Sequence, residues 1–336
     1  MKKYLTILVA IIGYSTVCIA QSNFVATLSH DGNFTHYYGS GALQSAYNAS
    51  EDGDIITLSP GTFSLSGMYK AITLRGTGID ATKSSVISSV VDIIPKYEGE
   101  IVIEGVRFSG GLKVYNDYSI EHQGKIKLIK NSINSLGAYT SNTSSTYSEG
   151  PIVRLYNNNI SSLTFYDKAN PDYMFYNCII AALPSYNAQT TTAFVNCIIN
   201  FNTYGSGLSY NMNYYNCIFR NSNTATADSY LARLSNTTTS NNCVATGSNY
   251  GVLFSSLLSG ANNKYVAPSA LFEQNNVLTE TAKQEYLGLD GTEVGIYGGN
   301  YPYDSKVQYP IITQFSSDVQ TSKEGILNIN VEVDGQ

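Results

Sequence analysis

Short apolar runs separated by polar turns recur along the middle of the chain. The clearest of them, at 126–130, 152–156, 173–176 and 193–195, each lead directly into an asparagine. A short run of β-branched, aliphatic and aromatic residues that ends in a turn residue predicts a β-strand. The pattern therefore predicts one such strand in every repeat, although it does not decide which residues of a run point inward.

The asparagines that end these runs define a repeat. Their successive spacings are 27, 19, 19, 20 and 26 residues, and an isoleucine or valine follows each of them two positions later. A period of about 20 residues, with insertions absorbed at one point per repeat, is typical of a solenoid. We expect the six asparagines to stack in one column as a hydrogen-bonded asparagine ladder. They are Asn131, Asn158, Asn177, Asn196, Asn216 and Asn242.

Four cysteines follow asparagines of the later repeats and share one repeat position. In-register neighbours on a parallel stack lie about 4.8 Å apart, and their Cβ vectors run parallel, which is poor disulfide geometry. We therefore favour a stack of small buried side chains, with disulfide bridges as the alternative. The four are Cys178, Cys197, Cys217 and Cys243.

The amino-terminal residues 1–20 have the features of a secretory signal peptide. Lys2 and Lys3 precede an apolar run, and Ala20 is a small residue at a suitable cleavage position. Export to the periplasm, the outer surface or the medium is expected. A lipoprotein with the lipid on Cys18 is the alternative. Residues 21–39 form a polar segment without a usable periodicity.

A short helix is expected at residues 40–50, because Leu43, Ala46 and Tyr47 share one helical face. It would cover the open end of the strand stack. The sequences ALQSA at 42–46, GDIITLSPGTF at 53–63 and ITLRG at 72–76 resemble the cap and first coils of the pectate-lyase-like superfamily. The segment 289–299 resembles the closing segment of exported β-helix proteins of Bacteroidetes.

The resemblance implies an all-β fold, a right-handed single-stranded parallel β-helix (a solenoid) over residues 40–305. It implies little about activity, because this fold carries lyases, hydrolases, esterases and binding proteins alike. Residues 306–336 predict a C-terminal β-strand pair, because 326–333 alternate strictly between apolar and polar side chains and 310–315 offer a partner strand. We favour folding of this pair back along the β-helix over docking on another chain.

Composition narrows the class of partner. Only 13% of the 336 residues are charged, against roughly 25% in average proteins. The net charge of −6 argues against nucleic acid, which normally requires a basic stripe. Beyond residue 20 no apolar run reaches the ~18 residues that span a bilayer, so no transmembrane segment is expected. The neutral surface, rich in Asn, Thr and Tyr, suits a polysaccharide or a cell-surface glycan.

Catalytic and metal signatures are sparse. Between residues 151 and 260 the acids are Asp167, Asp172 and Asp228, and they show no spacing that would bring two carboxylates within the roughly 5–10 Å of glycoside hydrolysis. The catalytic residues of a lyase or hydrolase are thus not identified. No cofactor or metal is expected, with a calcium loop at Asp290 and Glu293 as the alternative.

One outward column is a candidate ligand site. Lys127, Arg154 and Tyr173 occupy the same repeat position, and two like charges on adjacent strands would repel unless an anion lay between them. We expect them to bind a uronate- or sulfate-bearing saccharide. The alternative is neutralisation by Glu104 or Glu121, and Glu104 with Lys130 is expected to form a separate cross-coil ion pair.

The sequence thus favours an exported, non-catalytic module for glycan binding or surface interaction. The first alternative is a polysaccharide lyase or glycoside hydrolase of the pectate-lyase-like fold. The second is a structural or adhesive shaft. Neither the glycan nor the oligomeric state follows from the sequence.

Overall fold

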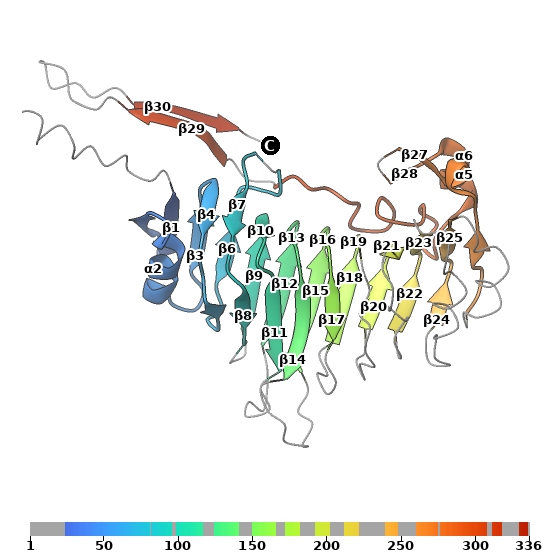
Figure 1. The fold of residues 1–336 in the computed structure, drawn as a ribbon, viewed down its shortest axis with the longest axis horizontal. Coiled ribbons are helices and arrows are strands. Elements are labelled where there is room, and N and C mark those ends of the chain that lie inside the picture. Colours follow the sequence, from blue (N-terminus) through green and yellow to red (C-terminus); the bar gives the residue numbers. More distant parts are fainter. Residues whose placement is uncertain are drawn as a thin grey trace, which may run out of the picture.

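The computed structural model describes residues 24–80, 82–95, 99–116, 124–140, 150–165, 172–181, 192–201, 212–221, 239–247, 260–274, 276–307, 311–317 and 329–334. Three sheets of parallel strands run side by side along one elongated body (Figure 1). The predicted all-β parallel solenoid, with its capping helix and C-terminal strand pair, is confirmed. The expected signal peptide, Cys18, Glu121, Asp167 and Asp228 lie outside the described residues.

The first sheet holds the strands that the apolar runs predicted. Within the described residues its order is β2-β1-β3-β6-β9-β12-β15-β18-β20-β22-β24, parallel from β3 onward. The strands in that order are β2 (Asn33–Tyr38), β1 (Val25–His30), β3 (Ile55–Leu58), β6 (Thr73–Arg75), β9 (Glu100–Glu104), β12 (Lys125–Ile129), β15 (Ile152–Tyr156), β18 (Asp172–Tyr176), β20 (Thr192–Val195), β22 (Met212–Tyr215) and β24 (Thr239–Asn241).

The second and third sheets follow the turn in each coil. The second contains β4 (Gly61–Phe63), β7 (Ser85–Ile87), β10 (Val106–Phe108), β13 (Ser132–Ile133), β16 (Asn159–Ile160), β19 (Ile179–Ile180), β21 (Ile198–Phe201), β23 (Ile218–Asn221), β25 (Val244–Thr246) and β26 (Lys264–Tyr265). The third contains β5 (Gly67–Met68), β8 (Val91–Ile93), β11 (Leu112–Asn116), β14 (Leu136–Thr140) and β17 (Leu163–Phe165).

Strict alternation along the first sheet separates the core from the surface. In β15, Val153 and Leu155 are fully buried, whereas Arg154 and Tyr156 are only partly covered. Inward side chains of successive strands stack, so that the Phe194 ring lies 4.6 Å from that of Phe175 at an interplanar angle of 13°. Apolar burial along this interior is the main source of stability.

The six asparagines do not form the single column expected. The strand register aligns Asn131 and Asn158 with Cys178, one residue beyond the position of Asn177. Asn177 is aligned instead with Lys130 and Asn157. The prediction was off by one residue because the 19-residue spacing from Asn158 to Asn177 conceals a 20-residue repeat. Two neighbouring columns therefore replace the one ladder.

The inner column contains Asn131, Asn158 and the four cysteines, which all donate a hydrogen bond to a buried backbone carbonyl. Asn131 Nδ2 donates to Ile103 O at 2.9 Å, and Asn158 Nδ2 donates to Leu128 O at 2.8 Å. The cysteine thiols of the later coils donate to the carbonyl at the same place on the preceding strand, at 3.3–3.7 Å. Each coil thus uses a buried donor to satisfy an inward carbonyl. All four cysteines are buried and free, which confirms the stack over disulfide bridges.

The outer column is defined by left-handed backbone. Its members have φ between +51° and +66°, a conformation that Asn and Gly adopt at little cost. Side-chain amides touch between coils at Asn216 and Asn196, 3.3 Å apart, and at Asn262 and Asn242, 3.2 Å apart. The column comprises Gly105, Lys130, Asn157, Asn177, Asn196, Asn216, Asn242 and Asn262.

The amino-terminal cap is larger than the sequence indicated. Helix α2 (Ala42–Ala49) lies at the end of the stack and buries Leu43, Ala46 and Tyr47, as predicted. The segment 21–39, for which no structure was predicted, contains the hairpin β1–β2, and β1 pairs antiparallel with β3. The hairpin was missed because β2 has no buried face to impose alternation.

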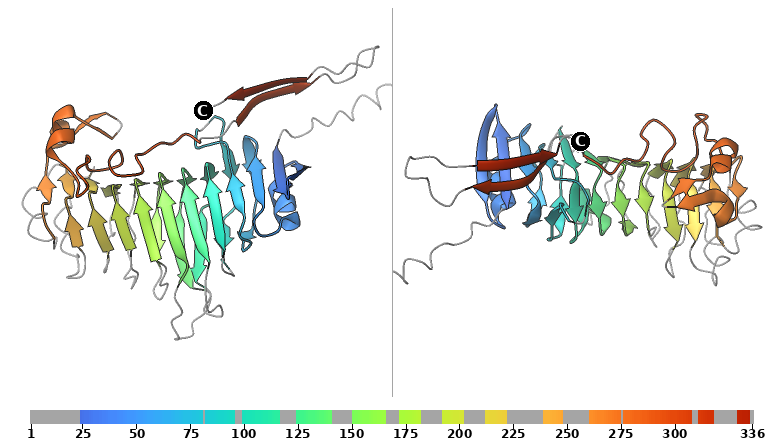
Figure 2. Two further views of the ribbon diagram at one scale, coloured as in Figure 1. Left: turned by 180° about the vertical axis from the view of Figure 1, so that it is seen from behind. Right: turned by 90° about the horizontal axis from the view of Figure 1, so that it is seen from above.

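The carboxy-terminal end is closed by short elements around a second apolar cluster that includes Leu271, Leu278 and Ala282. The elements are α5 (Pro268–Leu271), β27 (Phe272–Gln274), β28 (Val277–Leu278) and α6 (Glu280–Glu285). Beyond them the chain turns back along the solenoid towards its amino-terminal end (Figures 1 and 2). Strands β29 (Ile311–Ser317) and β30 (Ile329–Asp334) then pair antiparallel. In the described part of the chain, no helix is long and apolar enough to cross a membrane.

Candidate ligand-binding site on the first sheet

The return segment, residues 286–307, follows the outer column in reverse order. Near the carboxy-terminal end, Asn216 Oδ1 accepts from Leu289 N at 3.0 Å. In the middle, Asn177 Nδ2 donates to Ile296 O and Gly298 O at 2.8 and 2.7 Å. The outer column therefore serves mainly to hold this segment, and only secondarily as a ladder between coils.

Two further contacts hold the last part of the return segment. Asn157 Nδ2 donates to Pro302 O at 3.3 Å. Lys130 Nζ lies 2.9 Å from Asp304 Oδ2 and donates to Lys306 O at 2.5 Å. The expected ion pair between Glu104 and Lys130 is therefore wrong, because Glu104 is aligned with Ile129 and Lys130 turns towards the return segment.

The charge on Asp304 is stabilised by this contact. Partial burial alone would raise the pKa of the carboxyl, but the hydrogen bonds from Lys130 and from Lys306 N, with the positive charge of Lys130, hold that pKa below its ordinary value. The Lys130 side chain is 9% exposed. A largely buried ammonium needs such a partner.

The strand alignment predicted for the candidate ligand column holds for two of its three members. Lys127 and Arg154 are aligned on neighbouring strands and are partly exposed. The next residue in that column is Met174, whereas Tyr173 is aligned with Val153 and points into the core. Tyr173 is 0% exposed, so it offers no surface for stacking. The expectation failed because it placed the repeats of Arg154 and Tyr173 one residue out of register.

Arg154 is neutralised by a neighbour that the sequence did not suggest. Its Nη2 lies 2.7 Å from Asp172 Oδ2, and its Nη1 donates to the Asp172 carbonyl at 2.9 Å. Neutralisation by Glu104 or Glu121 was the alternative; the partner found is Asp172, and Glu121 lies outside the described residues. The side chains of Arg154 and Asp172 are 26% and 43% exposed, so the pair is accessible to a ligand.

Lys127 lies beside an aromatic ring instead of a carboxylate. Its Nζ lies 5.5 Å from the centroid of Tyr156, within the range of a cation–π contact. Among the described residues no ion pair forms at Lys127. Within the described part of the chain, the contact found at its ammonium is thus the Tyr156 ring.

Three tyrosines form an aromatic cluster next to these charges. Tyr156 and Tyr176 are stacked, with centroids 5.1 Å apart and an interplanar angle of 7°. Tyr301 of the return segment lies across both, with centroid distances of 4.9 and 5.7 Å and angles of 66° and 63°. Tyr301 is 49% exposed. We call this set, Tyr156, Tyr176 and Tyr301, the tyrosine cluster.

The phenols of Tyr156 and Tyr176 are held in their neutral form. Burial, and then the neighbouring tyrosines, raise the pKa of Tyr156 above its ordinary value. Burial likewise raises the pKa of Tyr176, against the lowering effect of Arg154. Neutral phenols both donate and accept hydrogen bonds, which matches the hydroxyl groups of a sugar.

Among the residues that the structure describes, carboxylates do not converge on this face. Glu100 and Asp172 belong to one outward column but are separated by Lys125 and Ile152. Three steps of about 4.8 Å place the two acids about 14 Å apart, beyond the roughly 5–10 Å that paired carboxylates need in glycoside hydrolysis. In the described part of this face, Asp172 is therefore paired to Arg154 and has no second acid at such a distance in its column.

Asp290 and Glu293, the residues of the candidate calcium loop, do not form a shared group of ligands among the described residues. Asp290 Oδ1 accepts from Thr292 N and Thr292 Oγ1 at 3.1 and 2.8 Å, so it closes its own turn. Glu293 is partly buried, and this burial raises the pKa of its carboxyl. Among the described residues, no group of three or more His, Cys, Asp or Glu could hold a metal ion.

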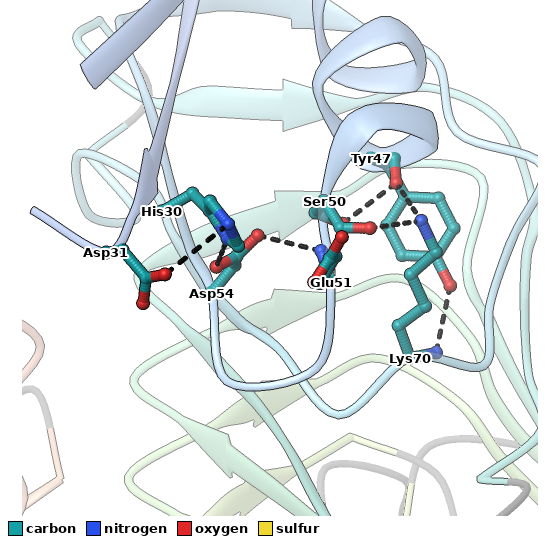
Figure 3. Close-up of polar contacts among 7 residues, drawn as sticks. All are labelled: His30, Asp31, Tyr47, Ser50, Glu51, Asp54 and Lys70. Atoms are coloured by element: carbon teal, nitrogen blue, oxygen red, sulfur yellow. Dashed lines mark hydrogen bonds and ion pairs between the residues drawn. The ribbon is translucent and has the colours of Figure 1, made fainter. Parts of the chain in front are cut away.

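A second polar cluster lies at the amino-terminal cap (Figure 3). His30 Nδ1 is 2.8 Å from Asp54 Oδ1, and Asp54 Oδ2 accepts from Glu51 N at 2.7 Å. The hydrogen bond to Asp54, and then the charge of Asp54, raise the pKa of His30. These contacts join the hairpin to the turn before β3 and contain no nucleophile, so we interpret the cluster as structural.

The end of α2 is closed by a lysine from the next turn of the chain (Figure 3). Lys70 Nζ donates to the carbonyls of Tyr47, Asn48 and Ser50 at 2.8, 3.1 and 2.6 Å. A cation at a helix C-terminus satisfies free carbonyls and opposes the helix dipole. This arrangement again serves the cap and not a ligand.

Sequence reasoning missed all three members of the tyrosine cluster. Tyr156 and Tyr176 occupy the residue before the left-handed turn in consecutive coils, so the correct register would have revealed them. Tyr301 carries no such signal, because it lies more than a hundred residues later and reaches the sheet only through the return segment.

The fold and this surface define a parallel β-solenoid protein with an aromatic and charged face. No family model matches the chain, and no curated protein matches it.

Proposed function

We propose that this protein is an exported glycan-binding β-solenoid whose ligand lies on the outer face of β12, β15 and β18. The observation that carries the proposal is the tyrosine cluster beside Lys127 and the Arg154–Asp172 pair. Aromatic rings pack against the C–H faces of sugars, while charged and hydroxyl groups bond their polar edges. The signal-peptide features of residues 1–20 support export.

The charges favour a saccharide that carries carboxylates or sulfates. Lys127 has no carboxylate partner among the described residues, and Arg154 has further N–H donors beyond those used by Asp172. The spacing of about 4.8 Å between strands is comparable to the length of one pyranose ring, so a chain could contact successive coils. We place the solenoid in the pectate-lyase-like superfamily as part of this proposal, on the resemblance of residues 40–76.

Binding is favoured over polysaccharide cleavage because no second carboxylate lies near Asp172 on this face within the described residues. A lyase or hydrolase remains the first alternative. A structural shaft is the second alternative, and it would need no exposed aromatic cluster.

The test is binding of purified protein to polygalacturonate, chondroitin sulfate and neutral cellohexaose, measured by calorimetry, with product analysis of each polymer. We expect binding to at least one acidic polymer without cleavage. Tyr156→Ala and Lys127→Ala should each weaken it by about tenfold, or about 1.4 kcal/mol.

Tyr38→Ala is the matched control, because Tyr38 is 61% exposed but lies on β2, away from the cluster. It should bind like the parent. Equal affinities of the parent, Tyr156→Ala and Lys127→Ala would rule out the proposed site. Shortened polymer products would favour the lyase or hydrolase instead.

A further inference from the structure

The tyrosine cluster is assembled from two parts of the chain that meet only in the folded protein. Tyr156 and Tyr176 belong to the first sheet, whereas Tyr301 belongs to the return segment. The same segment is fastened on either side of the cluster. Any movement of the segment would therefore change the surface offered to a ligand.

The fastening is strongest at its two ends. On one side, Ile296 is buried in the carboxy-terminal apolar cluster. On the other, Val307 is buried close to Gly78 and Gly105, where a Cβ on Gly105 would lie 2.4 Å from Val307 Cγ1. Between these anchors, Tyr301 and Pro302 are exposed. Side chains of the outer column hold this intervening stretch.

The contact nearest Val307 is made by charge-assisted hydrogen bonds from Lys130. Lys130 Nζ bonds both the Asp304 carboxylate and the Lys306 carbonyl, and Lys130 is itself largely buried. Pro302 lies two residues before Asp304 in the chain. Its carbonyl accepts a hydrogen bond from the side chain of Asn157, the residue after Tyr156. Charge-assisted hydrogen bonds of this kind are stronger than neutral ones.

We propose that the return segment is a working part of the ligand site, in which Lys130 and Asp304 act as positioning residues that hold Tyr301 on Tyr156 and Tyr176. Docking of the segment and binding of the glycan are then coupled, and each strengthens the other. This inference rests on the proposed function. Neither Lys130 nor Asp304 contacts the ligand in it.

The variant Asp304→Asn tests the coupling, because it removes the charge while Asp304 is 42% exposed and its loss leaves no cavity. Two readouts are needed. The first is ¹⁹F NMR of fluorotyrosine-labelled protein, with the Tyr301 resonance assigned from Tyr301→Phe. The second is the affinity for polygalacturonate. Glu280→Gln is the matched control, because it breaks an exposed ion pair with Lys283 on α6.

We expect Asp304→Asn to move the Tyr301 resonance towards that of free fluorotyrosine and to weaken polygalacturonate binding about fivefold or more. Glu280→Gln should change neither. In the parent, saturating polygalacturonate should slow hydrogen exchange of residues 303–307. That result would show the reciprocal effect of ligand on segment docking.

An unchanged Tyr301 resonance in Asp304→Asn would overturn the positioning role, whatever the affinity. If Asp304→Asn shifted the Tyr301 resonance but kept its affinity for polygalacturonate, and Tyr156→Ala still lost binding, the coupling between segment docking and glycan binding would be overturned. If Tyr156→Ala and Tyr301→Ala both bound like the parent, the proposed function would fail, and the resonance alone would decide whether Asp304 positions Tyr301.

Discussion

Individual side chains in this protein take their roles from the face of the strand on which they lie. Arg154 and Tyr173 illustrate this, because one points to solvent with Asp172 as partner and the other is fully buried. A shift of one residue in register reverses the face of every side chain in a strand. The strand register thus decides whether a tyrosine or arginine lies in the core or on the surface, and only then can its side-chain chemistry matter.

At the residue scale, His30 makes stability depend on pH. Its pKa is raised in the folded protein by Asp54, so folding favours the charged imidazole. The resulting stabilisation is fully present below the unfolded pKa of about 6.5 and is lost as pH rises through the higher folded value. We expect His30→Gln to lower the thermal midpoint more at about pH 5.5 than at about pH 8.5.

Scanning calorimetry at the two pH values checks this prediction. His36→Gln is the control, because the His36 ring contacts the Thr27 hydroxyl and not a carboxylate. A loss in His30→Gln that is the same at both pH values would contradict the ionic role of His30.

At the scale of elements, two columns of turn residues divide the structural work. The inner column satisfies buried carbonyls with amides in the early coils and with thiols in the later ones. The outer column combines left-handed backbone with amide groups that hold the return segment. Asparagine meets both requirements, which explains its preference at the six positions from Asn157 to Asn262, whereas Gly105 and Lys130 are the exceptions.

Asn177 tests this double requirement. Asn177→Ala should destabilise the fold by about 1 kcal/mol for the left-handed backbone, plus about 1 kcal/mol for each of the two lost hydrogen bonds. Asn177→Gly keeps the backbone conformation and should lose only the hydrogen-bond part. Urea unfolding measures both values.

The matched control is Asn159→Ala, because Asn159 is exposed on the neighbouring strand β16. It should change the free energy of unfolding by less than about 0.5 kcal/mol. Equal losses for Asn177→Ala and Asn177→Gly would show that the left-handed backbone contributes nothing at this position.

At the scale of the whole molecule, the solenoid is one continuous body closed at both ends and tied along its length by the return segment. Buried apolar side chains line its interior, and the four cysteines belong to that interior. Burial raises the pKa of Cys178, Cys197 and Cys217 well above the ordinary value. Cys243 is also fully buried.

We therefore expect none of these four thiols to react with a thiol-specific reagent at about pH 8 until the solenoid unfolds, because a buried thiol is inert. A Cys18→Ser background removes the fifth cysteine, and peptide mapping by mass spectrometry locates any label. All four should become reactive in urea. Reaction of a single cysteine under native conditions would indicate local opening of its coil.

The sequence by itself determined the class of fold. Strand-length apolar runs recurring about every 20 residues can bury their side chains only by stacking, so the parallel solenoid and its helical cap were predictable. The C-terminal strand pair was predictable from the alternation of its own residues. The free buried cysteines were predictable for the same reason. These features depend on local pattern and on the strand spacing common to all parallel sheets.

Only the tertiary structure decided the register of the coils and the composition of the candidate site. Loops of different length separate the repeats, so spacing alone did not reveal that Asn177 aligns with Asn157 and not with Asn158. The return segment brings Tyr301 and Asp304 to coils more than a hundred residues earlier in the chain. Such contacts arise from the path of the folded chain, which no local pattern encodes.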